Sequence, residues 1–131
     1  MKTARVKYDD LFRRARYLLR VIEERTNSDR DHPARVWGIP RGGTHVANIM
    51  EALDLPGGTI RVVTSPQDAD VAVDEIVDTG RTAERVLKDH GLRTVALYDR
   101  RAAAPAELRY TAPEWLVFPW EAGEVPGGES S

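Results

Sequence analysis

The chain has 131 residues, no cysteine and a formal net charge of −2 at pH 7. This length suits one domain with a hydrophobic core, and the lack of cysteine excludes disulfides, thiolate zinc sites and a cysteine nucleophile. The small net charge gives no support for a nucleic-acid partner, and no apolar run is long enough to span a membrane. We expect a cytoplasmic protein with one domain over residues 1–122 and a disordered tail over 123–131.

The N-terminal part predicts one amphipathic helix, capped by Asp9 or Asp10 and running to about Arg25. Apolar residues recur on one face, and arginines and glutamates occupy the rest. We interpret the charged positions as a solvated surface. The polar stretch 26–33 is expected to be a linker before the first strand.

A first strand, over 35–39, is followed by a loop and by a helix expected over 44–53. The loop reads Pro40-Arg41-Gly42-Gly43. A glycine-bearing loop that enters a helix N-terminus presents backbone amides to an anion, and an arginine adds a full positive charge. Taken alone, the loop is also consistent with a plain strand-to-helix turn.

A second strand is expected over 59–64, and residues 65–69 separate it from an apolar, β-branched run over 71–77. This run predicts a buried strand. Asp74 and Glu75 stand near its end, where two adjacent carboxylates would repel each other unless they met a cation or sugar hydroxyls. Carboxylates are preferred ligands of Mg²⁺, often through water.

Directly after this strand the chain reads Asp78-Thr79-Gly80-Arg81-Thr82. A helical pattern follows over 83–90, so this loop also leads into a helix N-terminus. The free amides of such a terminus, together with threonine hydroxyls, suit a phosphate group. Phosphate, sugar hydroxyls and magnesium together indicate a phosphorylated sugar, although an ordinary turn with solvent-facing carboxylates is the alternative. Neither a Walker A loop nor a G-x-G-x-x-G motif is present.

The run D-E-I-V-D-T-G-R-T resembles the signature with which type I phosphoribosyltransferases bind 5-phosphoribosyl-1-diphosphate (PRPP). The resemblance is closest to the xanthine-guanine, or purine, enzymes. It implies an α/β fold of three layers, with a mostly parallel central sheet flanked by helices. A small C-terminal hood is also implied, whereas the lid loop that the family places before the acidic strand is reduced here to residues 65–69.

The resemblance also implies roles for the two loops. Asp74 and Glu75 would hold the ribose hydroxyls and Mg²⁺, partly through water and PRPP, and Asp78 would act as general base. The loop Asp78-Thr79-Gly80-Arg81-Thr82 would bind the 5′-phosphate. The loop Pro40-Arg41-Gly42-Gly43 would bind pyrophosphate, with a cis peptide bond before the arginine.

A strand over 94–98 and the later run W-L-V-F-P-W complete the pattern. By the same resemblance, Arg100 takes the place of a lysine that contacts the exocyclic oxygen of the purine. Trp115 and Leu116 match the pair that packs on the purine and reads its edge. Core or interface packing is the alternative for Trp115.

These features predict Mg²⁺-dependent transfer of a phosphoribosyl group from PRPP to xanthine, guanine or hypoxanthine, with release of pyrophosphate. The short 65–69 connection leaves a second interpretation, a non-catalytic sensor of PRPP or a nucleotide, and an inert structural domain is the third. A homo-oligomer, dimer or tetramer, is expected from the family, with neither nucleic acid nor membrane as a partner.

Overall fold

The computed structural model describes residues 2–54 and 57–121, so the expected tail over 123–131 lies outside the described residues. Its main sheet has four parallel strands in the order β3-β2-β4-β5. The strands are β2 (Ala34–Gly38), β3 (Ile60–Val63), β4 (Val71–Val77) and β5 (Thr94–Asp99). All four were expected from their apolar, β-branched sequences, with bounds shifted by a residue or two.

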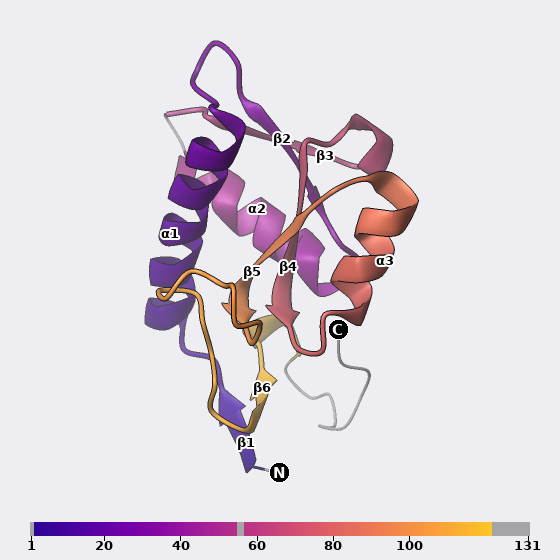
Figure 1. Ribbon diagram of the computed structural model, residues 1–131. Helices are drawn as coiled ribbons and strands as arrows, with labels where there is room; N and C mark the ends of the chain where they lie inside the picture. The colour runs from indigo at the N-terminus through magenta and orange to yellow at the C-terminus, as the bar shows by residue number, and fades with distance from the viewer. Residues whose placement is uncertain (1, 55–56, 122–131) are drawn as a thin grey trace.

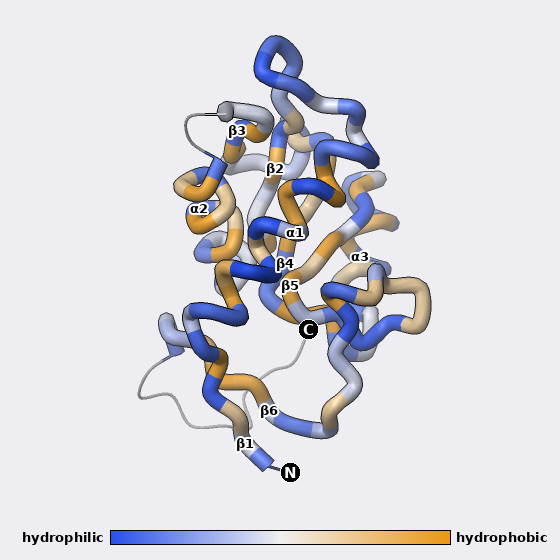
Figure 2. Tube along the Cα trace, turned by 90° about the vertical axis from the view of Figure 1, so that its left-hand side faces the viewer, coloured by the Kyte–Doolittle hydropathy of each residue, from blue (hydrophilic) through white to orange (hydrophobic). Residues whose placement is uncertain are grey.

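Three helices cover the sheet, α1 (Tyr8–Thr26), α2 (Gly42–Asp54) and α3 (Arg81–His90). The larger apolar core joins α1 and α2 to the sheet, and a smaller one lies under α3. Figure 1 shows α3 on the side of the sheet opposite α1 and α2. The predicted three-layer α/β fold with a parallel sheet is therefore confirmed. Figure 2 shows the apolar residues gathered along β2, β4 and β5 and polar residues in the outer loops.

Topology brings the two predicted anion loops together. Strands β2 and β4 are neighbours, with Gly38 opposite Val73. Because the strands are parallel, the loops that follow them leave from the same edge of the sheet. The connection from β3 to β4 holds one 3₁₀ turn (Pro66–Asp68), as short as expected. None of the helices within residues 2–54 and 57–121 has the length and apolarity to cross a membrane.

A second, two-stranded parallel sheet was not expected from the sequence. It pairs β1 (Lys2–Arg5) with β6 (Glu114–Val117), with Ala4 opposite Leu116. Beyond β6 the chain makes a 3₁₀ turn (Pro119–Glu121). Figure 1 places this sheet beyond the arrowheads of β4 and β5, so the two ends of the described chain form the hood together.

The start of α1 differs from the prediction. The helix begins at Tyr8, and its N-cap is Lys7, which makes no side-chain capping hydrogen bond. Asp9 and Asp10 lie inside the first turn, where carboxylates are favoured by the helix dipole. The Asp10 carboxylate forms ion pairs with both Arg13 and Arg14. This residue therefore pairs with arginines of the same helix and does not cap it.

Arg14 is a buried cation that joins α1 to the end of β5. It is 8% exposed, and its Nη1 donates to the backbone oxygens of Leu97 (2.8 Å) and Leu108 (3.0 Å). Its Nε lies 3.0 Å from Asp10 Oδ2, and the guanidinium carbon lies 4.1 Å from the centre of the Tyr98 ring. The amphipathic pattern alone had placed this arginine on a solvated face.

Arg14→Met is expected to lower the free energy of unfolding by about 3 kcal/mol, because it removes two hydrogen bonds to the buried carbonyls of Leu97 and Leu108 and breaks a partly buried ion pair. The matched change Arg13→Met, at a side chain 58% exposed, is expected to cost less than about 1 kcal/mol. Urea denaturation of both variants measures the difference. Equal losses would contradict a structural role for the buried arginine.

Candidate active site

The loop between β2 and α2 approaches the acidic strand closely. Its Pro40–Arg41 peptide bond is cis, as the resemblance implied. The amides of Gly43 and Thr44 donate to the backbone oxygens of Ile39 (2.8 Å) and Arg41 (3.2 Å). The Gly43 amide, which was expected to meet an anion, is therefore used inside the loop.

Three glycines allow this close approach. A Cβ on Gly43 would lie 2.4 Å from the backbone oxygen of Val73, and one on Gly38 would lie 2.2 Å from the oxygen of Gly43. A Cβ on Gly42 would fall 1.2 Å from Glu75 Oε2. The first two contacts are with backbone, and the third places the Glu75 carboxylate directly at the start of α2. The arginine loop and the acidic pair therefore share one site.

In the acidic pair Asp74 is buried and Glu75 is half-buried. Asp74 is 2% exposed, and its Oδ1 accepts a hydrogen bond of 2.9 Å from the amide of Glu75. Burial, and then the neighbouring Asp74 charge, raise the pKa of Glu75 to about 8. The indole N–H of Trp120 offsets part of that rise, although its geometry falls short of a hydrogen bond. A cation or a set of hydroxyls at the pair would stabilise its ionised form.

Glu75→Gln is expected to remove a pH dependence of stability. The unfolded chain ionises this carboxyl near its usual pKa of 4.5, whereas the folded chain keeps it protonated up to about pH 8. The contribution of this carboxyl to the free energy of unfolding is therefore fully present below pH 4.5. It is lost as the pH rises from 4.5 to about 8. Melting temperatures from about pH 5 to about pH 9 should fall in the wild type relative to Glu75→Gln. Glu51→Gln, on the exposed face of α2, is the control, and parallel curves for all three proteins would contradict the buried carboxyl.

The chemistry of the pair suits Mg²⁺, but the pair alone would not complete its coordination. Hard oxygen ligands and a raised carboxyl pKa fit a divalent cation. Within the described part of the chain no group of three or more His, Asp or Glu side chains is placed to hold a metal ion. A cation here would take its remaining ligands from water and from a bound substrate, as the sequence led us to expect.

The loop after β4 forms a second helix start at the same edge of the sheet. Gly80 is the N-cap of α3, with φ of 89°, a conformation that favours glycine. No side chain caps this helix, and Arg81 donates its amide to Thr79 Oγ1 at 3.3 Å. The amides of Thr82 and Ala83, in the first turn, make no hydrogen bond within the residues described. They are available to an anion.

Comparisons with known proteins agree on one architecture. No family model and no curated protein sequence matches the chain. A solved purine phosphoribosyltransferase from Pyrococcus horikoshii Ot3 superposes with a TM-score of 0.65 and 22% identity, covering 100% of both chains. The Helicobacter pylori xanthine-guanine-hypoxanthine phosphoribosyltransferase superposes with a TM-score of 0.60 and 20% sequence identity. The match covers 92% of this chain and 94% of that protein. The chain has the phosphoribosyltransferase fold.

In this phosphoribosyltransferase fold, Arg100 does not present a free guanidinium to a base. Its Nη1 and Nη2 donate to the backbone oxygens of Ala112 (2.7 Å) and Glu114 (2.9 Å). Its Nε lies 3.2 Å from Asp78 Oδ1. Arg100 therefore ties the expected general base to the hood strand β6. All three of its nitrogens contact the protein, and the contact with a purine that the resemblance implied stays a prediction.

The side chains of Leu116 and Trp115, which were expected to contact the purine, both pack at least partly against the protein. Leu116 is 8% exposed and belongs to the main core, so its side chain packs on the protein. Trp115 is half-buried in β6, opposite Thr3. Neither placement tests base binding by the β6 backbone, which stays a prediction.

An aromatic stack beside the acidic pair was missed from the sequence. Trp120 stacks on His45 of α2, with ring centres 4.9 Å apart and planes 11° apart, and on Phe118, at 5.1 Å and 13°. The sequence signal for it was the pair of aromatic residues in Phe118-Pro119-Trp120, whereas Trp115 was expected to be the aromatic contact of the base. Through this stack the hood reaches the start of α2 and the neighbourhood of Glu75.

Proposed function

We propose that the protein transfers a phosphoribosyl group from PRPP to a purine base of the xanthine, guanine or hypoxanthine type, with Mg²⁺. The main support is the convergence of the arginine loop and the acidic strand, measured by the position of the Glu75 carboxylate against Gly42. The shared architecture with solved purine phosphoribosyltransferases adds to it.

In this proposal, different residues of the chain would bind the different groups of PRPP. Thr79, Thr82 and the free amides of the α3 start would bind the 5′-phosphate. Arg41 and the Gly42 amide would bind the diphosphate and stabilise its charge as it leaves C1. Asp74 and Glu75 would hold the ribose hydroxyls and Mg²⁺, which supplies charge neutralisation when bound.

The remaining step is a proton transfer. A purine nitrogen forms the new bond to C1 while the bond from C1 to the diphosphate oxygen breaks. The base must lose a proton, and Asp78 would accept it. The Arg100 contact holds Asp78 in position. The stacked Trp120 and Phe118 provide an apolar wall beside the acids.

The test is a pyrophosphate-release assay with Mg²⁺, PRPP and each purine base in turn. Release that depends on PRPP and on one or more of the bases is the expected result. The short 3₁₀ connection before β4 supports the second candidate, a PRPP- or nucleotide-binding sensor, because little chain is present to shield the reacting carbon from water. PRPP binding without release from any base would select that sensor, and no binding at all would reject both.

A further inference from the structure

The 3₁₀ turn after β6 joins the hood to the first part of α2. The turn is closed on itself, because the amide of Phe118 donates to Glu121 Oε1 at 3.0 Å and the amide of Glu121 donates to the Phe118 oxygen at 2.9 Å. Between them lies Trp120, stacked on His45 and on Phe118. Phe118 is buried, Trp120 is half-buried and His45 is exposed. The stack therefore runs from the core to the surface and fixes the turn against α2.

The same turn lies beside the acidic pair. Burial and the Asp74 charge are the main causes of the raised pKa of Glu75. The Glu121 charge raises this pKa further, and the Trp120 indole N–H lowers it, so two consecutive residues of the turn are near this carboxylate. The indole nitrogen is buried and makes no hydrogen bond to a described residue. Water therefore does not reach this edge of the ring.

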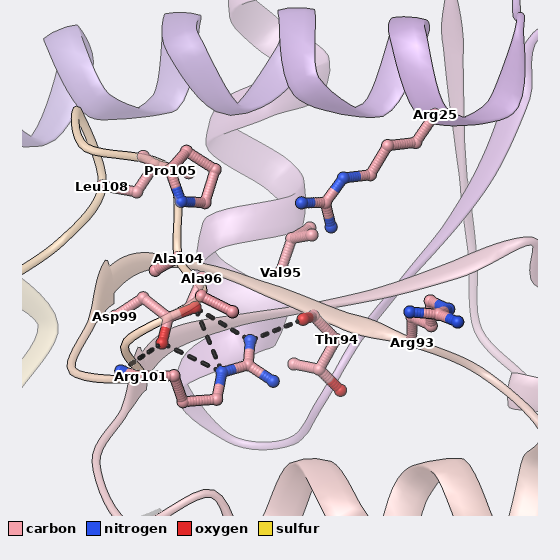
Figure 3. A pocket seen from close by; sticks show the side chains of 11 residues that line it. Arg25, Arg93, Thr94, Val95, Ala96, Asp99, Arg101, Ala104, Pro105 and Leu108 are labelled. Atoms are coloured by element: carbon pink, nitrogen blue, oxygen red, sulfur yellow. Dashed lines mark hydrogen bonds and ion pairs between the residues drawn. The ribbon is translucent and has the colours of Figure 1, made fainter.

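The end of β5 braces the hood. Arg100 donates to the backbone oxygens of Ala112 and Glu114, on the segment that leads into the hood strand β6. The residues on either side of Arg100 are paired with each other, since Arg101 approaches Asp99 at 2.8 Å through Nη2 and at 3.0 Å through Nε. Figure 3 shows this pair in the wall of a cavity beside β5. Asp99 is 3% exposed, so the brace is fixed to a buried carboxylate.

The part of the substrate that the turn covers follows from its two neighbours. In the proposed complex, Glu75 holds a ribose hydroxyl and the Gly42 amide binds the diphosphate. C1 of PRPP lies between these groups, because it is bonded both to the diphosphate oxygen and to C2, which carries a hydroxyl. Trp120 lies beside Glu75 on one side and, through His45, against the helix that begins at Gly42 on the other.

We propose that Trp120 shields C1 of bound PRPP from water, with the hood turn over 118–121 as a fixed cover. This inference rests on the proposed transfer reaction. Water that reached C1 would form a bond to it as the bond from C1 to the diphosphate oxygen breaks, and would lose a proton to solvent. The products would be ribose 5-phosphate and diphosphate, without nucleotide. A transferase has to exclude this water, and the 3₁₀ connection before β4 provides little chain for the purpose.

The test measures two products in one assay, diphosphate and nucleotide, with Mg²⁺, PRPP and the base that the wild type accepts. Diphosphate in excess of nucleotide reports attack by water. Trp120→Leu removes the stack and should raise the ratio of excess diphosphate to nucleotide at least about tenfold. Trp120→Phe keeps an aromatic ring there and should stay within about threefold of the wild type. A merely structural loss would lower both products together and leave the ratio unchanged.

A second variant and a control complete the test. His45→Leu removes the exposed ring of the stack, on which the core does not depend, and should also raise the ratio, at least about threefold. Trp37→Leu is the matched control, because Trp37 contacts another histidine, His90, with ring centres 5.7 Å apart, beside the smaller core under α3. It should leave the ratio unchanged, whatever it does to the melting temperature.

The outcomes separate this inference from the proposed function. The shield is overturned, and the transferase stands, if the wild type forms nucleotide and neither Trp120→Leu nor His45→Leu raises the ratio. It is also overturned if Trp37→Leu raises the ratio as much as Trp120→Leu does. No diphosphate release by the wild type with any base would reject the proposed transfer, and this inference with it.

Discussion

Asp78→Asn is expected to lower turnover at least about 100-fold while changing PRPP affinity less than about threefold. A positioned general base contributes roughly 100- to 10,000-fold to a proton-transfer step. Asparagine keeps the size of the side chain but cannot take up the proton. The fold should survive the change, because Arg100 keeps its bonds to Ala112 and Glu114. Steady-state kinetics with the accepted base, and calorimetry with Mg²⁺ and PRPP, measure the two quantities.

Asp89→Asn provides the matched control for this comparison. Asp89 is an exposed carboxylate on the far turn of α3. Its replacement removes the same charge without touching the loop at the helix start, and turnover should stay within about twofold of wild type. If Asp78→Asn lowers PRPP affinity as much as it lowers turnover, Asp78 serves binding and its assignment as the base is wrong.

Gly43→Ala is expected to lower the free energy of unfolding by about 3 kcal/mol or more and to abolish PRPP binding. The added Cβ would lie 2.4 Å from the backbone oxygen of Val73, and backbone on a central strand cannot move aside without disturbing its neighbours. The arginine loop would be pushed away from the acidic pair. Urea denaturation and PRPP calorimetry on the same preparation give both results.

Gly42→Ala separates packing from ligand binding. Its Cβ would meet the Glu75 carboxylate, the far end of a side chain that can rotate. We therefore expect a loss of stability smaller than that of Gly43→Ala, together with weaker PRPP binding, because the displaced carboxylate no longer lies at the start of α2. A loss of stability equal to that of Gly43→Ala would contradict this division.

The main sheet was predictable because its strands are short runs rich in apolar residues, of which β4 is the most β-branched. The two loops at its edge were predictable for a related reason. Parallel strands end together, so Arg41 and Glu75 meet at one edge although they are far apart in sequence. The resemblance further suggested the cis peptide bond before Arg41, which is present in the structure.

The hood was not predictable from local sequence. β1 and β6 are four residues each and pair across nearly the whole chain, and no period within either run signals such a partner. The contacts of Arg100 were not predictable for the same reason, since its acceptors at Ala112 and Glu114 exist only once β6 is in place. Arg14 was taken as solvated because helix periodicity does not show that β5 ends above it.

The central claim is that the Arg41 loop and the Asp78 loop serve one PRPP molecule. Titration calorimetry of the wild type with PRPP and Mg²⁺ tests it most directly, with Arg41→Gln and Thr82→Val as variants. We predict one PRPP per chain and at least about tenfold weaker binding when either loop is changed, since each loses a donor to a charged oxygen. No heat of binding in the wild type, or an affinity that neither substitution alters, would contradict the shared site.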